Sequence, residues 1–222
     1  FILRTHTNRT ATNTKHHNTM KKVSLEYAFP AIFKFRYLLK KRSGVNADCD
    51  IDCIDIDEGA IEEARINADN SPWSDRIHPF MSDFKQFFCD KKYDLIVSNP
   101  PFFNNGVLAP DKSRQNARHT VELSFEQLIF KSITLLSDIG KLCLISPTDT
   151  EEEITKSCAE IGAYVHQKVV IYTKPGKEPK RCLWEISKHN SDKRCSELFV
   201  QNSDGQYSEQ YIGLCKDFYM NM

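Results

Sequence analysis

The sequence YDLIVSNPPFF, at residues 93–103, is the stretch from which the fold follows. Residues 93–97 form a short apolar run interrupted only by Asp94, which predicts a buried strand of a parallel sheet. Pro100 and Pro101 end this strand, because proline lacks an amide donor and has a fixed φ. Asn99 is therefore expected at the carboxyl end of the strand, where open α/β sheets bind ligands.

The Asn-Pro-Pro-Phe sequence at residues 99–102 has a chemical use beyond ending a strand. The exocyclic amine of adenine is a poor nucleophile, because its lone pair is delocalised into the ring. The side-chain carbonyl of Asn99 and the backbone carbonyl of Pro100 are rigid acceptors for the two N–H bonds of such an amine. Phe102 offers a stacking face for a base taken out of a nucleic-acid stack. The alternative is a strand-ending Pro100-Pro101 turn without chemistry.

Length and composition are those of a soluble globular protein with one full domain. The chain has 222 residues, of which 40% are hydrophobic and 27% charged, and this suffices for one complete core. No window approaches the roughly 18 apolar residues of a membrane span. The eight cysteines are scattered and form no CxxC pair, which favours reduced core thiols in the cytoplasm over a disulfide framework or a metal site.

Charge divides the chain into two parts. Residues 1–42 hold ten basic residues and one acidic residue, whereas residues 43–222 hold 20 basic and 29 acidic residues. A step of this size marks a compositional boundary. Residues 1–28 show no periodicity and are predicted to be a disordered or foreign basic tail, with an organelle transit segment as the alternative. Residues 29–222 are predicted to form the folded domain.

Strand and helix patterns alternate along that domain. Predicted strands cover residues 51–57, 76–80, 93–97 and 140–147, and predicted helices cover 31–42, 59–70, 121–137 and 148–161, with Thr150 and Glu153 as a capping box. The final third is β-rich: residues 164–173 and 180–187 form a hairpin, 197–201 an edge strand and 207–220 a closing helix. This order predicts an α/β, Rossmann-like fold whose mostly parallel sheet ends in an antiparallel hairpin.

Acidic residues follow two of the predicted strands. Asp55 ends the strand of residues 51–57 and is the candidate for holding ribose hydroxyls, with Asp57 as the alternate. The aspartates of this strand are equally consistent with a solvated face. After the next strand, Asp83 is placed to accept from the amine of a nucleoside adenine, and Phe84 to pack on its ring. A simple helix cap at Ser82 or Asp83 explains the same residues.

A long polar connection follows the strand that ends at Asn99. It holds Lys112, Arg114, Arg118 and His119. A basic loop beside an adenine pocket is what a nucleic-acid substrate needs for phosphate contacts. An ordinary surface loop is the alternative.

Four segments together resemble one family: residues 68–77, 98–103, 114–119 and 206–219. They are similar to the class I S-adenosylmethionine (SAM) dependent enzymes that methylate N6 of adenine 37 in valine tRNA, over roughly residues 51–222. The resemblance implies a Rossmann-like methyltransferase with SAM as cofactor, the anticodon loop of valine tRNA as partner, and a monomer in the cytoplasm.

The family pattern also implies roles for individual residues. It makes Asp55 the cofactor-ribose residue, Asp83 the cofactor-adenine contact and Asn99 with Pro100, Pro101 and Phe102 the target-amine site. Arg114, Arg118 and His119 fall in the family's loop beyond that site, where they are expected to contact tRNA. No general base is obvious, and none is required, because the nitrogen attacks in line and loses its proton afterwards. Catalysis would then be mostly positioning.

The front of the chain departs from the family pattern. Enzymes of this class carry an Asp-x-Gly-x-Gly-x-Gly-like loop after their first strand, which lets the methionine end of the cofactor approach the backbone closely. Before Gly59 this chain has one glycine, Gly44, in a different setting. The first strand is therefore expected to be missing or atypical. We predict weak SAM binding and low activity for this polypeptide.

Other functions fit parts of the same pattern. An N-methyltransferase of this class could act on DNA adenine, rRNA guanine or protein glutamine. A catalytically dead relative could keep RNA binding alone. Asp55 would also suit the ribose of a nicotinamide cofactor, but the chain has no Gly-x-Gly-x-x-Gly sequence and does have Asn-Pro-Pro-Phe.

Overall fold

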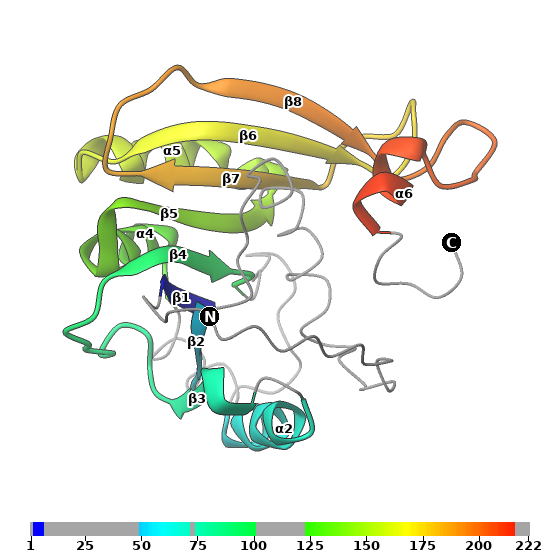
Figure 1. Ribbon diagram of the computed structural model, residues 1–222. Helices are drawn as coiled ribbons and strands as arrows, with labels where there is room; N and C mark the ends of the chain where they lie inside the picture. Colours follow the sequence, from blue (N-terminus) through cyan, green and yellow to red (C-terminus); the bar gives the residue numbers. More distant parts are fainter. Residues whose placement is uncertain (1, 7–48, 72–73, 101–122, 216–222) are drawn as a thin grey trace, which may run out of the picture.

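A computed structural model describes residues 2–6, 49–71, 74–100 and 123–215, and these form one eight-stranded sheet with helices packed on it (Figure 1). The strand order is β3-β2-β1-β4-β5-β7-β6-β8. The strands are β1 (Ile2–His6), β2 (Cys49–Asp55), β3 (Ile77–Met81), β4 (Tyr93–Ser98), β5 (Leu136–Pro147), β6 (Tyr164–Tyr172), β7 (Arg181–Ser187) and β8 (Arg194–Phe199).

Strand directions confirm the predicted, mostly parallel sheet with an antiparallel C-terminal hairpin, since β1 and β7 alone among the eight described strands run opposite to the others. β2 is parallel to β3, and β4 is parallel to β5. β7 is antiparallel to both β5 and β6, which is the predicted C-terminal hairpin. β8 lies at the edge, parallel to β6. Each strand predicted after residue 50 is present, with boundaries that shift by a few residues.

The central position between β2 and β4 is filled by the first residues of the chain. β1 is antiparallel to both neighbours: Ile2 pairs with Cys53 on one side and with Val97 on the other. Disorder was the expectation for this segment, and the structure places residues 2–6 within the sheet instead. Two facing strand edges offer a full set of backbone partners, and this outweighs the lack of a sequence pattern. The remaining tail and the predicted helix 31–42 lie outside the described residues.

Helix starts follow the local capping chemistry. α2 (Glu58–Asp69) begins at Asp57, whose Oδ1 accepts the Ala60 amide at 2.7 Å. α4 (Phe125–Leu135) has a capping box of Ser124 and Gln127. The capping box predicted at Thr150 is absent, because the Thr150 hydroxyl donates to the Pro147 carbonyl at 2.8 Å. That contact belongs to a short 3₁₀ turn, η2 (Thr148–Thr150), that precedes α5 (Glu151–Glu160).

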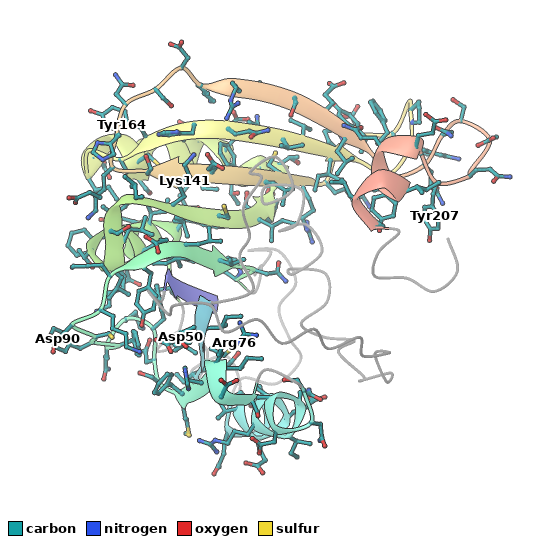
Figure 2. The ribbon with its side chains drawn as sticks, viewed as in Figure 1. Asp50, Arg76, Asp90, Lys141, Tyr164 and Tyr207 are labelled. Carbon is teal, nitrogen blue, oxygen red and sulfur yellow. The ribbon has the colours of Figure 1, made fainter. Side chains whose placement is uncertain are left out.

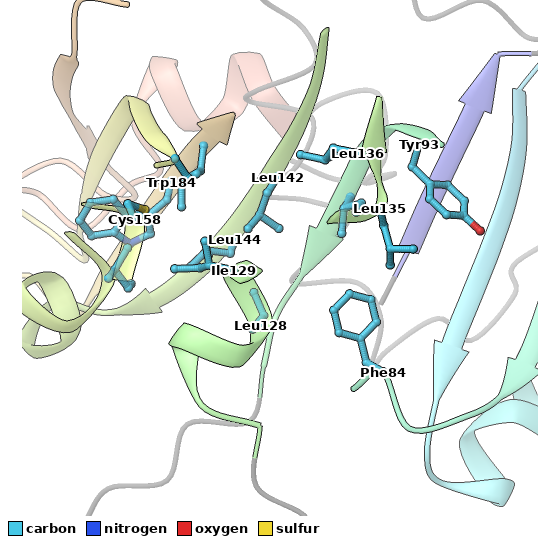
Figure 3. Packing of buried hydrophobic residues seen from close by; sticks show 14 of the residues in the cluster. Phe84, Tyr93, Leu128, Ile129, Leu135, Leu136, Leu142, Leu144, Cys158 and Trp184 are labelled. Carbon is cyan, nitrogen blue, oxygen red and sulfur yellow. The ribbon is translucent and has the colours of Figure 1, made fainter. Parts of the chain in front are cut away.

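Two apolar clusters form the core on opposite faces of β5. Leu142 and Leu144 belong to the larger cluster, which α4 and α5 cover (Figure 3). Ile145 points to the other face, as alternation along a strand requires, and joins a smaller cluster. Leu214 from α6 (Glu209–Cys215) packs against that smaller cluster. Trp184 of β7 is fully buried, and its indole N–H donates to the Ser146 hydroxyl at 2.9 Å.

Buried cysteines serve this core as small apolar residues. Cys158 on α5 is 3% exposed, and burial raises its pKa to about 11. Cys215 on α6 is fully buried, and burial raises its pKa to about 12. Both thiols are therefore protonated at neutral pH, which matches the predicted role of the cysteines.

A buried side-chain hydrogen bond spans the central strand. The Tyr93 hydroxyl of β4 donates to Asp52 Oδ2 of β2 at 2.7 Å, and Asp52 is only 3% exposed. Burial, with hydrogen bonds to Cys89 and Asp52, raises the pKa of Tyr93. Lys91 Nζ lies 3.8 Å from the same carboxylate oxygen. Among the described residues Asp52 Oδ1 has no hydrogen-bond partner, so the Tyr93 hydroxyl is the main group that satisfies this carboxylate.

None of the helices in the described part of the chain has the length and apolar character that crossing a bilayer requires.

Replacing Tyr93 with phenylalanine should destabilise the protein by about 1–3 kcal/mol, because it leaves a buried carboxylate oxygen unpaired. Urea unfolding measures the change. The matched control is Tyr172→Phe, whose hydroxyl donates to Glu197 at 3.2 Å in an exposed setting. We expect a clearly smaller loss there. Equal losses for the two variants would contradict a special role for the Tyr93–Asp52 bond.

Candidate functional site at the carboxyl edge of the sheet

The carboxyl ends of β2, β3, β4 and β5 share one edge of the sheet, as predicted. β2 and β4 are both antiparallel to β1 and hence parallel to each other. Ile2 pairs with Cys53 and Val97, so Asp55 and Asn99, each two residues further on, lie level on the two sides of β1. Two strand spacings, about 10 Å, separate them. An acidic residue and an amide thus flank one stretch of the edge.

The two carboxylates at the end of β2 have different surroundings. Asp57 uses its side chain to cap α2. Asp55 is exposed, and its Oδ1 accepts the Asp57 amide at 3.0 Å. Its backbone carbonyl accepts the Ser82 amide at 2.9 Å, which holds the end of β2 beside the residues that follow β3. Of the two candidates that the sequence left open, the geometry therefore favours Asp55 for a ligand.

Asp83 and Phe84 follow β3, and the structure gives both of them structural contacts. Asp83 Oδ1 accepts the Lys85 amide at 2.9 Å, and the Asp83 carbonyl accepts the amides of Gln86 and Phe87. This is the capping role that the sequence offered as the alternative. Phe84 is 3% exposed and packs in the larger core cluster (Figure 3). Burial of its ring favours a core role over the expected contact with a nucleoside.

Two exposed apolar side chains at this edge escaped the sequence analysis. Ile56 is 50% exposed and Met81 is 59% exposed. Met81 pairs with Asp55 in the β2–β3 ladder, so all three residues lie at the same strand ends. Exposed apolar surface beside a carboxylate suits a flat base joined to a sugar. One signal in the sequence could have revealed Ile56. This isoleucine continues the alternation of apolar and acidic residues beyond Ile54, the last buried residue of the strand.

Asn99 is the first exposed residue after a buried strand. Ser98 is 4% exposed and pairs with Leu144 of β5, and Pro100 is buried. The asparagine thus faces solvent at the strand end and is not turned into the core. Six other residues predicted for the site lie outside the described residues: Pro101, Phe102, Lys112, Arg114, Arg118 and His119.

The described part of the chain contains no group of three or more His, Cys, Asp or Glu side chains that could hold a metal ion. The exposed polar side chains of Asp55 and Asn99 provide hydrogen-bond acceptors at this edge. The exposed carboxylate of Asp55 suits sugar hydroxyls, and the amide oxygen of Asn99 suits an amine.

Comparisons with known proteins point to one class of enzyme. Residues 7–106 match the UPF0020 family model, described as RMKL-like, methyltransferase domain. The chain is 40% identical over 173 residues to a tRNA1(Val) (adenine(37)-N6)-methyltransferase from Phocaeicola vulgatus, covering 78% of this chain and 74% of the relative. It is 35% identical over 172 residues to an enzyme of the same name from Tolumonas auensis, covering 78% and 72%.

The fold has a counterpart among solved structures. A predicted O-methyltransferase from Agrobacterium tumefaciens superposes with a TM-score of 0.56 at 19% identity, over 74% of this chain and 76% of that one. At this identity the likeness concerns the fold alone. It agrees with the Rossmann-like class expected from the sequence.

Substitutions can distinguish the role of Asp55, the last residue of β2, from that of Asp57, the N-cap of α2. Asp57→Ala should lower the free energy of unfolding by about 1 kcal/mol, because α2 loses its N-cap. Asp55→Asn keeps an acceptor for the Asp57 amide and should change it by less than about 0.5 kcal/mol. Urea titration of both variants provides the measurement. A larger loss for Asp55→Asn would show that Asp55, too, is structural.

Proposed function

This chain belongs to the family of tRNA1(Val) (adenine(37)-N6)-methyltransferases, and we propose that it transfers a methyl group from SAM to N6 of adenine 37 in valine tRNA. One observation carries the proposal: Asp55 and Asn99 lie level at the carboxyl edge, on either side of the central strand. A cofactor whose sugar is held at Asp55 would then bring its methyl group next to a target amine held at Asn99. We further propose that the protein works as a monomer in the cytoplasm.

The ends of β2 and β3 fit the adenosine portion of the cofactor. Asp55 presents an exposed carboxylate for the ribose hydroxyls, and Ile56 and Met81 present apolar surface for the base. Asp83, which already caps a turn, is proposed to accept from the adenine amine as well. When bound, SAM supplies a methyl group on a positively charged sulfur. The task of these side chains is to hold that methyl group at a fixed position on the edge.

Asn99 acts on the other substrate. Its side-chain oxygen accepts from one N–H of the adenine amine, and the Pro100 carbonyl accepts from the second. Both hydrogen bonds localise the nitrogen lone pair and aim it along the edge. Pro101 and Phe102 complete this site in the proposal, with Phe102 as the stacking face for the flipped base. Lys112, Arg114, Arg118 and His119 are proposed to contact the phosphates of the tRNA.

The alternative functions are not favoured. Methylation of DNA adenine, rRNA guanine or protein glutamine, and RNA binding without catalysis, all fit the motif alone. The relatives that match this chain over most of their length are named for one reaction on one tRNA. A nicotinamide enzyme is disfavoured by the same relatives.

Asn99→Ala should lower methyl transfer to valine tRNA by about 10²–10³-fold, the typical effect of losing one preorganised hydrogen bond to the reacting group. Tritium transfer from labelled SAM measures the rate, and tRNA binding should change by less than about twofold because phosphate contacts dominate affinity. Asn190→Ala, at an exposed position after β7, is the matched control. Unchanged transfer in Asn99→Ala would refute the proposed site.

Calorimetric titration of the wild-type protein with SAM should give an affinity weaker than micromolar. The reason is that the chain lacks the glycine loop of the family, and the strand in the central position, β1, runs antiparallel to its neighbours. Micromolar affinity would contradict this expectation and would mean that other parts of the chain hold the methionine end.

A further inference from the structure

The connection between β6 and β7, residues 173–180, is rich in lysine; we call it the β6–β7 loop. It holds Lys174, Lys177 and Lys180 against one acid, Glu178, and the first residue of β7, Arg181, follows it. The part of the chain that carries it has the opposite net charge, since residues 43–222 hold 20 basic and 29 acidic residues. A local positive segment on an acidic domain indicates a partner with negative charge.

The β6–β7 loop lies at the same edge as Asn99. Ser98 pairs with Leu144, and Pro147, three residues on from Leu144, pairs with Arg181, directly after the loop. The backbones of Asn99 and Arg181 are therefore two strand spacings and two residues apart, on the order of 12 Å. Figure 1 shows the loop on the side of the sheet to which β4 points.

Several contacts hold the base of the loop. The Thr148 hydroxyl donates to the Pro179 carbonyl at 3.0 Å. The Gln201 amide donates to the Thr173 carbonyl at 2.9 Å. At the end of the neighbouring strands, the rings of Tyr172 and Phe199 stack with centroids 4.9 Å apart. The tip turns through Gly176 at φ +75°, a conformation that favours glycine. A loop fixed in this way presents its charges with little further loss of conformational entropy on binding.

The lysines of the loop have no carboxylate partner among the described residues. Lys177 and Lys180 are exposed, and Lys174 is half-buried. Lysines of the neighbouring strands are paired: Lys168 of β6 with Glu151, and Lys141 of β5 with Glu185. Lysines without an internal partner are available for the phosphates of a nucleic acid.

We propose that the β6–β7 loop binds the sugar–phosphate backbone of the tRNA beside the target nucleotide, through Lys174, Lys177 and Lys180. This inference rests on the proposed function, because it takes tRNA as the substrate. Phosphate contacts at this distance from Asn99 fix the register of the RNA without reading its sequence. Placement of the target base is then shared between the strand end at Asn99 and the loop.

An aromatic residue beside the loop strengthens the match to nucleic acid. Tyr207 is 47% exposed and lies on the same side of the sheet as the loop (Figure 2). Gln201 connects the segment of Tyr207 to the loop. It forms an antiparallel β-bridge with Tyr207, and its amide donates to the Thr173 carbonyl. Exposed aromatic rings next to lysines are typical of surfaces that bind single-stranded RNA.

Binding of valine tRNA, measured by fluorescence anisotropy across a series of salt concentrations, tests the proposal. The Lys177→Gln/Lys180→Gln variant should bind roughly tenfold more weakly at low salt, and its slope of log K against log salt should fall by about 1.5. Glu178→Gln should bind more tightly than wild type. The matched control is Lys193→Gln/Arg194→Gln, two exposed basic residues at the opposite edge, which should behave as wild type.

Equal losses in the loop variant and the control variant would overturn the role of the β6–β7 loop and leave the proposed function standing. Wild-type protein that fails to bind valine tRNA at any salt concentration would overturn both. Thermal unfolding of each variant accompanies the titrations, since all five substitutions are at solvent-exposed positions and should leave the midpoint unchanged.

Discussion

The structure depends on the pairing of two facing strand edges, those of β2 and β4. An unpaired strand within a sheet leaves a row of backbone donors and acceptors without partners, and such groups are costly when water is excluded. β1 supplies these partners on both sides. The Tyr93–Asp52 hydrogen bond adds a side-chain link between the same two strands. Together they join the halves of the sheet, so that all the parallel strands end at one edge.

The direction of β1 has a consequence for the site. An antiparallel strand places His6 opposite Cys49, at the amino edge. A parallel first strand would instead deliver the residues after it to the carboxyl edge, where the family has its glycine loop. In this chain the described part of that edge includes the carboxyl ends of β2, β3, β4 and β5. The residues proposed for adenosine and for the target amine, Asp55 and Asn99, lie at this edge.

Charge divides the edge into two parts with different partners. The ends of β2 and β3 carry carboxylates, which suit neutral hydroxyls and amines as hydrogen-bond donors. The β6–β7 loop carries lysines and suits phosphates. A polyanion is repelled by the first part and attracted by the second, and this agrees with the separate places proposed for the cofactor and the RNA.

The sequence by itself determined the alternation of strands and helices, the C-terminal hairpin and the positions of Asp55 and Asn99 at strand ends. These follow from local rules, because periodicity, proline and strand ends act over a few residues. Tertiary structure alone decided four points: that residues 2–6 enter the sheet, that Asp57 caps a helix while Asp55 faces solvent, that Phe84 belongs to the core, and that the lysine-rich loop lies near Asn99. Each of these depends on which distant segment pairs or packs against which. Local patterns do not encode that choice, because it is made by the free energy of the whole sheet.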